Sequence, residues 1–200
     1  MWLYSKNATI NQPWVKGIKQ RLQWVVPIKT LLERDSRMAK EEDRHFMSLF
    51  DDSNFCCWNL DTLVRKKEQP PNARRGVFLG TMDLGFGIVD SDDGSTSVLN
   101  NEFALVELKL NLKTYKNVSF KDICQKIAGT QQYLFEIEAF HSEYFMVCPA
   151  QLVSEFISEF ARESEEYTQY DYHVNPIDIH ELYKRFFNPL KTIHQESQDY

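Results

Sequence analysis

The segment Phe103–Leu110 places the strongest constraint on how this 200-residue chain can fold. It begins as a continuous apolar run and ends with charged and apolar residues in alternation, Glu107-Leu108-Lys109-Leu110. This pattern is typical of a buried strand whose end emerges at a site. Side chains alternate along a strand, so Glu107 and Lys109 point to the same face. We therefore expect a central strand that carries a carboxylate and an ammonium group near its end.

The other hydrophobic patterns predict an α/β protein. Spacings near 3.6 residues predict helices over residues 27–50, 120–139, 151–162 and 177–187. Short apolar runs predict further strands at residues 77–79, 84–89 and 144–148. A hairpin followed by a strand–helix–strand crossover gives a mixed four-stranded central sheet flanked by helices. We expect this αβββαβ core to be followed by extra C-terminal helices.

Acidic residues interrupt the apolar stripe of the first predicted helix. A 100° helical wheel places Asp35 and Glu42 on that stripe, where an unpaired charge is costly to bury. In an alternative interpretation the helix breaks near Asp35-Ser36, and one of these residues caps a second helix.

Charge and composition divide the chain into three predicted parts. We expect a basic and aromatic arm or helix over 1–26, a core over 27–163 and an acidic, tyrosine-rich extension over 164–200. Residues 1–75 carry 14 basic and 9 acidic side chains. Residues 76–138 carry 5 basic and 9 acidic side chains, and residues 139–200 carry 4 basic and 11 acidic ones. The net charge of −6 therefore excludes a uniformly basic nucleic-acid coat, but it leaves the amino-terminal part basic.

The cysteines and the hydropathy of the chain indicate where in the cell the protein is expected to reside. The four cysteines form no CxxC pair, and too few ligands stand at close spacing for a zinc site. We expect four reduced thiols and a cytoplasmic location, with the nucleus left open. No run of 18 apolar residues and no secretory leader is found, so no membrane association is predicted.

Three residues form the candidate catalytic constellation. Asp83 stands where a predicted strand begins, and Glu107 and Lys109 share one face of another strand. If the two strands are neighbours, two carboxylates and an ammonium group converge. Two carboxylates suit Mg²⁺, or Mn²⁺ in its place, with waters and a substrate phosphate as the remaining ligands. A nearby lysine can assist the attacking water and stabilise developing negative charge.

The spacing of Asp83 and Glu107-Leu108-Lys109, with the predicted order of helices and strands, resembles the PD-(D/E)xK nuclease superfamily. The resemblance covers residues 27–148 and implies a restriction-endonuclease-like fold. It implies that Asp83 and Glu107 are metal ligands and that Lys109 is a catalytic base or electrostatic helper. Met82 stands where the motif has proline.

The resemblance also implies roles for two helices. Many members carry a glutamine on the helix after the ExK strand, and Gln131 matches it better than Gln132 by helical phase. Some members add an acidic residue from the first helix, where Glu42 is the best placed by phase. A first-helix histidine is a metal ligand in a viral-type variant of the fold, which makes His45 a weaker candidate.

Short basic clusters precede the constellation. Lys66 and Lys67, with Arg74 and Arg75 after the Pro70-Pro71 turn, are predicted to contact a phosphate backbone. In the alternative interpretation, these four residues are ordinary charged side chains of solvent-exposed loops. The stretch 16–21, flanked by tryptophans, can serve as an arm on nucleic acid or as a helix packed on the core.

These observations predict a Mg²⁺-dependent endonuclease that acts on nucleic acid, with DNA favoured over RNA. One alternative is a catalytically inactive nucleic-acid- or protein-binding module on the same fold, within a larger nuclease or recombination complex. Another is an interaction protein that recruits a basic partner through its acidic C-terminal region. A homodimer and a larger nuclease complex both stay open as assemblies.

Overall fold

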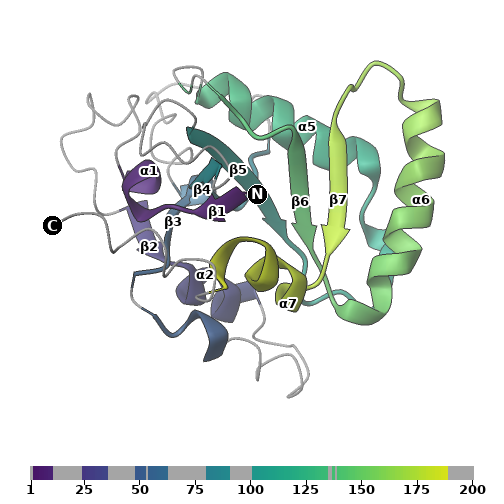
Figure 1. Cartoon of the computed structure of the whole chain (residues 1–200). Helices are drawn as coiled ribbons and strands as arrows, with labels where there is room; N and C mark the ends of the chain where they lie inside the picture. The colour runs from purple at the N-terminus through teal and green to yellow at the C-terminus, as the bar shows by residue number, and fades with distance from the viewer. Residues whose placement is uncertain are drawn as a thin grey trace, which may run out of the picture.

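The computed structural model forms a mixed seven-stranded sheet with helices on both faces (Figure 1). It describes residues 2–10, 24–35, 48–52, 54–62, 80–90, 101–134, 137 and 139–188. The strands are β1 (Trp2–Tyr4), β2 (Val25–Pro27), β3 (Cys56–Asn59), β4 (Leu84–Asp90), β5 (Asn101–Leu108), β6 (Glu143–Val147) and β7 (His173–Ile177). The α-helices of this part include α1 (Lys6–Ile10), α2 (Ile28–Asp35), α5 (Phe120–Tyr133), α6 (Val153–Glu166) and α7 (Ile179–Leu182). The predicted α/β class with a mixed sheet and flanking helices is therefore confirmed.

The sheet has the order β2-β3-β4-β5-β6-β7, and β1 pairs with β4 off this path. The pairs from β2 to β5 are antiparallel, whereas β5–β6 and β6–β7 are parallel. Strands β4, β5 and β6 correspond to three predicted strands. Four strands were not predicted, namely β1, β2, β3 and β7, so the described sheet is larger than the expected four-stranded one. The predicted strand at 77–79 lies outside the described residues.

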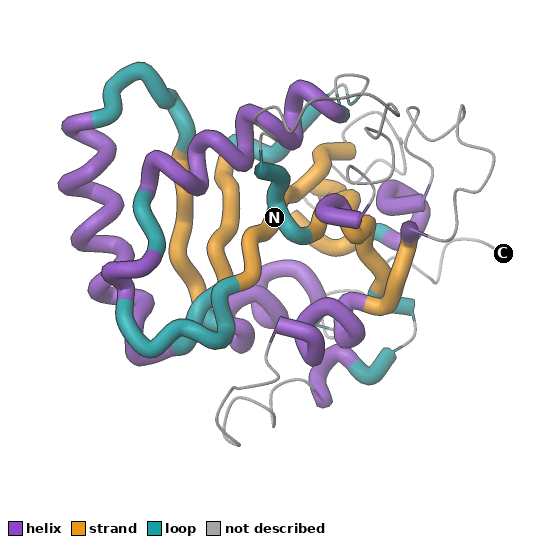
Figure 2. The backbone as a smooth tube through the Cα atoms, turned by 180° about the vertical axis from the view of Figure 1, so that it is seen from behind, coloured by secondary structure: helices purple, strands orange, loops and turns teal. Residues whose placement is uncertain are grey.

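Strand β5 is buried on both faces and so separates two hydrophobic layers. Phe103 and Leu105 belong to the layer that contains α5 and α6. Ala104 and Val106 belong to the layer that contains α2, α7 and the π-helical turn η7 (Tyr183–Phe187). Figure 2 shows these helices on opposite sides of the strands. The alternation predicted for the end of β5 therefore places Glu107 on the α5 side.

Helix α5 is shorter than predicted. Its start is fixed by the Ser119 side chain, which accepts a hydrogen bond from the Asp122 amide at 3.2 Å. The sequence predicts a helix to residue 139, but α5 ends at Tyr133. The chain at 139–141 instead runs beside β5, where the Phe103 amide donates to the Ala139 carbonyl at 2.9 Å and the Phe103 carbonyl accepts from His141. Pairing with the sheet therefore replaces the last predicted turns.

The predicted C-terminal extension contributes to the sheet. Strand β7 pairs in parallel with β6, with Val147 opposite Ile177. Helix α6 continues to Glu166, across the predicted boundary at 163/164. The predicted helix around 177–187 corresponds to α7 and η7, which bury Leu182, Phe186 and Phe187.

The described parts of the predicted N-terminal arm also join the sheet. Strand β1 pairs with β4, β2 pairs with β3, and Trp24 is buried in the layer of α5. The stretch 16–21 lies outside the described residues. Of the first predicted helix, α2 covers Ile28–Asp35 and a 3-10 helix covers Ser48–Phe50, while residues 36–47 lie outside the described part.

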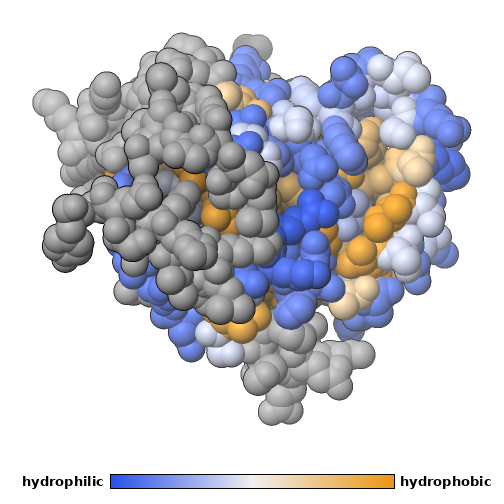
Figure 3. Space-filling view, in the orientation of Figure 1, coloured by the Kyte–Doolittle hydropathy of each residue, from blue (hydrophilic) through white to orange (hydrophobic). Residues whose placement is uncertain are grey.

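The surface of the described residues is mostly hydrophilic on the face that Figure 3 shows, with some apolar atoms near α6. Among the residues that the structure describes, Ile157 on α6 is the large apolar side chain that stands exposed, at 50%. Within the described ranges, we find no helix with the length and apolar character that crossing a membrane requires.

Gly87 allows helix α1 to pack directly on β4. A Cβ atom at Gly87 would lie 2.3 Å from the Ala8 carbonyl carbon and 2.6 Å from the Thr9 amide nitrogen. The contact is reinforced because the buried Thr9 hydroxyl accepts from the Gly87 amide at 2.9 Å, and the Gly87 carbonyl accepts from Ser5. The absence of a side chain here is what permits this close approach.

We expect Gly87→Ala to lower the free energy of unfolding by about 1 to 3 kcal/mol, because the new methyl group would overlap backbone atoms. Gly80→Ala is the matched control, since the nearest atom to its Cβ is Cγ of the flexible Lys126 side chain at 3.2 Å. Urea unfolding of both variants measures the difference. Equal losses at the two positions would contradict the proposed packing.

Candidate functional site

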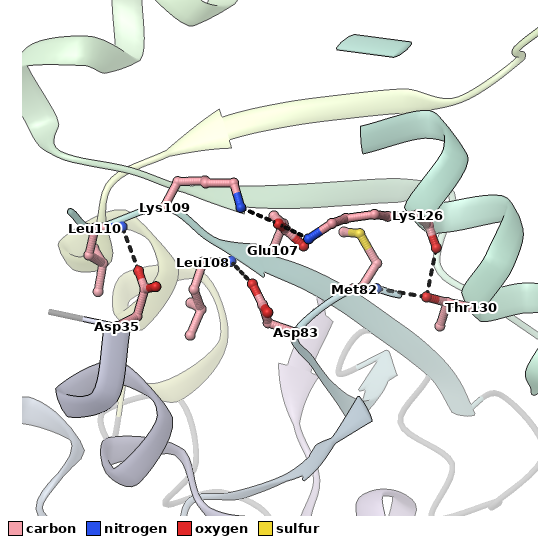
Figure 4. Close-up of polar contacts among 9 residues, drawn as sticks. All are labelled: Asp35, Met82, Asp83, Glu107, Leu108, Lys109, Leu110, Lys126 and Thr130. Atoms are coloured by element: carbon pink, nitrogen blue, oxygen red, sulfur yellow. Dashed lines mark hydrogen bonds and ion pairs between the residues drawn. The ribbon is translucent and has the colours of Figure 1, made fainter. Parts of the chain in front are cut away.

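The ends of β4 and β5 bring the predicted constellation together. Leu84 pairs with Val106 in the antiparallel ladder, so Asp83 lies beside Glu107 at the next position. The Asp83 carboxylate accepts a hydrogen bond from the Leu108 amide at 2.8 Å, which fixes it against β5. Figure 4 shows Asp83, Glu107 and Lys109 at this end of the sheet. The expectation that the two carboxylates come from neighbouring strands is met.

Glu107 is the most constrained group of the site. Its side chain is 0% exposed, and its Oε1 atom accepts hydrogen bonds from both Lys109 and Lys126. The Lys109 Nζ atom lies 2.5 Å from Oε1. The Oε2 atom is buried, and the described residues offer it no hydrogen-bond partner. A buried carboxylate oxygen in this position is an available lone-pair donor for a bound group.

Lys126 is a site residue that the sequence reasoning missed. It projects from α5, and its aliphatic stem passes over Gly80, just before Asp83 in the chain. The same helix holds this segment through Thr130, whose hydroxyl accepts from the Met82 amide at 2.8 Å and donates to the Lys126 carbonyl. Helical spacing is the sequence signal that could have identified Lys126. It lies three residues after Ile123 and four before Thr130, both buried, so it belongs to the same side of α5.

Asp35 is the acidic residue that the first helix brings to the site. It is the last residue of α2, and its Oδ2 atom accepts from the Leu110 amide at 2.7 Å (Figure 4). The sequence places Asp35 on the apolar stripe of the first predicted helix, although helical phase favours Glu42 as the acidic ligand. Glu42 and His45 lie outside the described residues, so their predicted roles stay predictions.

Burial and charge perturb the carboxylates. Burial, together with the charge of Asp83, raises the pKa of Glu107 to about 7, although Lys126 and Lys109 act in the opposite direction. Burial also raises the pKa of Asp35, and the charge of Asp83 adds to this effect. Both shifts arise because carboxylates stand close together in a region with little solvent.

The carboxylates have the opposite effect on Lys109. Burial acts to lower the pKa of Lys109, but its contacts with Glu107 and the charges of Asp83 and Asp35 outweigh this and raise it. Lys109 is therefore protonated at neutral pH in this arrangement. An ammonium group can orient a water molecule or stabilise negative charge, but it cannot accept a proton.

Gln131 points to a different part of the structure. Its amide nitrogen donates to the Tyr144 hydroxyl at 2.8 Å, and its amide oxygen accepts from the Tyr172 hydroxyl at 3.1 Å. These contacts link α5 to β6 and to the chain before β7. They do not support the predicted catalytic role of Gln131, which stays a prediction. The alternative Gln132 is exposed on the same helix.

The predicted nucleic-acid contacts Lys66, Lys67, Arg74 and Arg75 lie outside the described residues. The cysteines lie within them, and all four are buried, free thiols. Burial raises the pKa of Cys124 and of Cys148 to about 12, so neither is a reactive thiolate at neutral pH.

The described residues contain no group of three or more His, Cys, Asp or Glu side chains arranged to hold a metal ion. The donor set at the site is Asp83 and Glu107, with Asp35 nearby. Carboxylate pairs suit Mg²⁺, which binds through one or two carboxylates and keeps several waters. The unpartnered Oε2 atom of Glu107 fits such an ion, because it is a buried acceptor that lacks a donor.

Comparison with known proteins found no matching family model, no matching curated protein and no matching solved structure.

We expect Glu107→Gln to gain stability relative to the wild type as the pH rises. With its pKa raised to about 7, Glu107 binds a proton more tightly in the folded chain than in the unfolded one, so the free energy of unfolding falls between about pH 4.5 and 7. Glutamine does not titrate. In EDTA, the difference between variant and wild type should therefore move in favour of the variant by about 2 to 3 kcal/mol from pH 5 to pH 8.

Urea unfolding at the two pH values measures this difference. Glu155→Gln, on the exposed side of α6, controls for the loss of one carboxylate. A difference for Glu107→Gln that is the same at both pH values would contradict the assigned environment of Glu107.

Proposed function

We propose that this protein is a metal-dependent nuclease that hydrolyses phosphodiester bonds in nucleic acid, with DNA as the first substrate to test. The observation that carries the proposal is the convergence of Asp83, Glu107 and Lys109 where β4 begins and β5 ends. Carboxylates and an ammonium group at one site are the chemistry that metal-assisted phosphodiester hydrolysis needs.

The topology supports a restriction-endonuclease-like fold as part of this proposal. Helix α2, antiparallel strands β3, β4 and β5, helix α5 and the parallel strand β6 follow one another in the chain. This is the order of helices and strands that the resemblance to the PD-(D/E)xK superfamily implies. Strands β1, β2 and β7 extend the sheet around that core.

Asp83 and Glu107 are the residues that would hold Mg²⁺ or Mn²⁺. When bound, the ion would lower the pKa of a coordinated water and neutralise charge on the phosphate. Two features of the structure favour binding of such an ion. The Leu108 amide fixes the Asp83 carboxylate, and burial excludes water from Glu107, which strengthens its attraction for a cation. Asp35 adds negative charge nearby.

Lys109 is assigned an electrostatic role. Lys109 lies just after β5, and its side chain contacts Glu107 and is 26% exposed, so it reaches toward solvent while remaining paired. Because surrounding carboxylates raise its pKa, it stabilises negative charge on the phosphate and orients the attacking water. Of the two roles that the resemblance implies for Lys109, catalytic base and electrostatic helper, this assignment favours the electrostatic helper.

The contacts of Glu107 favour a second candidate function, an inactive binding module on the same fold. Two ammonium groups already neutralise this carboxylate, and the described residues hold no three-ligand metal group. In such a module the cluster would hold β4, β5 and α5 together, and it would do so without a divalent ion.

Plasmid nicking with Mg²⁺ or Mn²⁺ tests the proposed activity. We expect wild-type protein to nick the plasmid, and we expect Lys109→Ala and Asp83→Asn each to reduce the rate on the order of 100-fold or more, because each removes a charge at the reacting phosphate. Lys113→Ala is the matched control, since Lys113 is exposed just beyond the same strand. It should retain the wild-type rate.

Calorimetry with Mn²⁺ separates the two candidates. Binding that is lost in Asp83→Asn supports the nuclease. A wild-type protein that is inert on DNA and RNA and binds no Mn²⁺ would exclude the nuclease and leave the binding module.

A further inference from the structure

Glu107 holds two ammonium groups on a single carboxylate oxygen. The Lys109 and Lys126 side chains both meet Oε1 and are 26% and 29% exposed, whereas Glu107 is 0% exposed. The second oxygen, Oε2, has no partner among the described residues. The positive charge is therefore concentrated on one side of the carboxylate. One ammonium would already neutralise Glu107, so the second needs a further explanation.

The two lysines differ in how they are held. Lys109 follows Glu107 by two residues, just after the end of β5, and it is also attracted by Asp83 and Asp35. Lys126 comes from α5 on a flexible four-carbon stem that passes over Gly80 (Figure 4). Its ammonium group donates a hydrogen bond to Oε1 of Glu107. Of the two, Lys126 is the group that can leave with less cost.

A divalent cation at Asp83 and Glu107 would change the charge balance at this point. Like charges repel strongly where solvent is scarce, so a cation on Glu107 would oppose both ammonium groups. The displaced Lys126 ammonium would remain near the site because α5 is anchored there through Thr130 and Met82. A lysine in that position is a suitable point-charge partner for a phosphate oxygen.

We propose that Lys126 exchanges partners, holding Glu107 in the metal-free protein and contacting a phosphate of the nucleic acid once a divalent cation occupies the carboxylate. The inference rests on the proposed function. It makes Lys126 both an internal competitor for the cation and a substrate-binding residue. Two measurements should then change in opposite directions when the charge of Lys126 is removed.

The first measurement is Mn²⁺ affinity by calorimetry. We expect Lys126→Met to bind Mn²⁺ about tenfold or more tightly than the wild type, because the competing ammonium group is gone. Lys121→Met is the matched control, since Lys121 is exposed on the first turn of the same helix. It should bind Mn²⁺ like the wild type.

The second measurement is the salt dependence of binding to duplex DNA. It is made in the Lys109→Ala background, where cleavage is suppressed. Each lost phosphate contact lowers the slope of log Kobs against log salt by about one. With Mn²⁺ present, adding Lys126→Met should reduce the slope by this amount. In EDTA the slope should not change, because Lys126 is then on Glu107.

Three outcomes would overturn the inference or its premise. Unchanged Mn²⁺ affinity in Lys126→Met, with the wild type binding Mn²⁺, shows that Lys126 does not compete. A salt slope that Lys126→Met leaves unchanged in Mn²⁺ shows that Lys126 does not move to phosphate. Absence of Mn²⁺ binding in the wild type removes the proposed function itself.

A wild-type measurement covers the case in which Lys126→Met does not fold. In ¹⁵N-lysine-labelled protein, the side-chain ammonium resonance of Lys126, assigned with Lys126→Arg, should shift on addition of Mg²⁺. A resonance that stays in place while Mg²⁺ binds would contradict the exchange of partners.

Discussion

The complete burial of the Glu107 carboxylate is the constraint on which this end of the sheet depends. A buried charge without partners is unstable, and removing one partner from a buried pair costs about 3 to 5 kcal/mol. Ammonium groups from two parts of the chain meet this carboxylate, Lys109 just after β5 and Lys126 of α5. The contact of Lys126 joins α5 to the end of the strand. The same helix holds the segment that carries Asp83, through the hydrogen bond between Thr130 and Met82.

The site forms where both layers of the protein reach the same end of β5. Glu107 lies on the side of α5, whereas Asp35 arrives from α2, which packs on the opposite face. The backbone amides of Leu108 and Leu110 hold Asp83 and Asp35 respectively. The end of β5 and the two residues that follow it thus position three acidic groups, Glu107, Asp83 and Asp35.

Patterns local in the chain predicted much of this arrangement, and long-range contacts decided the rest. The apolar run before Glu107 identified β5 correctly, because a strand that is buried on both faces is a continuous run of apolar residues in the sequence. Strand β7 has no such run, since His173, Asn175 and Pro176 are unusual in a strand, and its pairing depends on β6. Helical spacing places Lys126 near the buried side of α5, but its contact with Glu107 depends on how α5 packs on the sheet. Helical phase did place Gln131 toward the sheet, but the tyrosines of the neighbouring segments occupy its amide.

The parallel pairing of β6 with β7 has a consequence for how the chain is made. All residues of the site precede β6, yet β6 gains its outer neighbour only after α6 and the following loop have been synthesised. Until then the nascent polypeptide exposes a hydrophobic edge with unpaired backbone groups, which invites association with other chains. Translation speed and chaperone access over 148–177 are therefore expected to influence the yield of folded protein, although none of these residues supplies a group to the site.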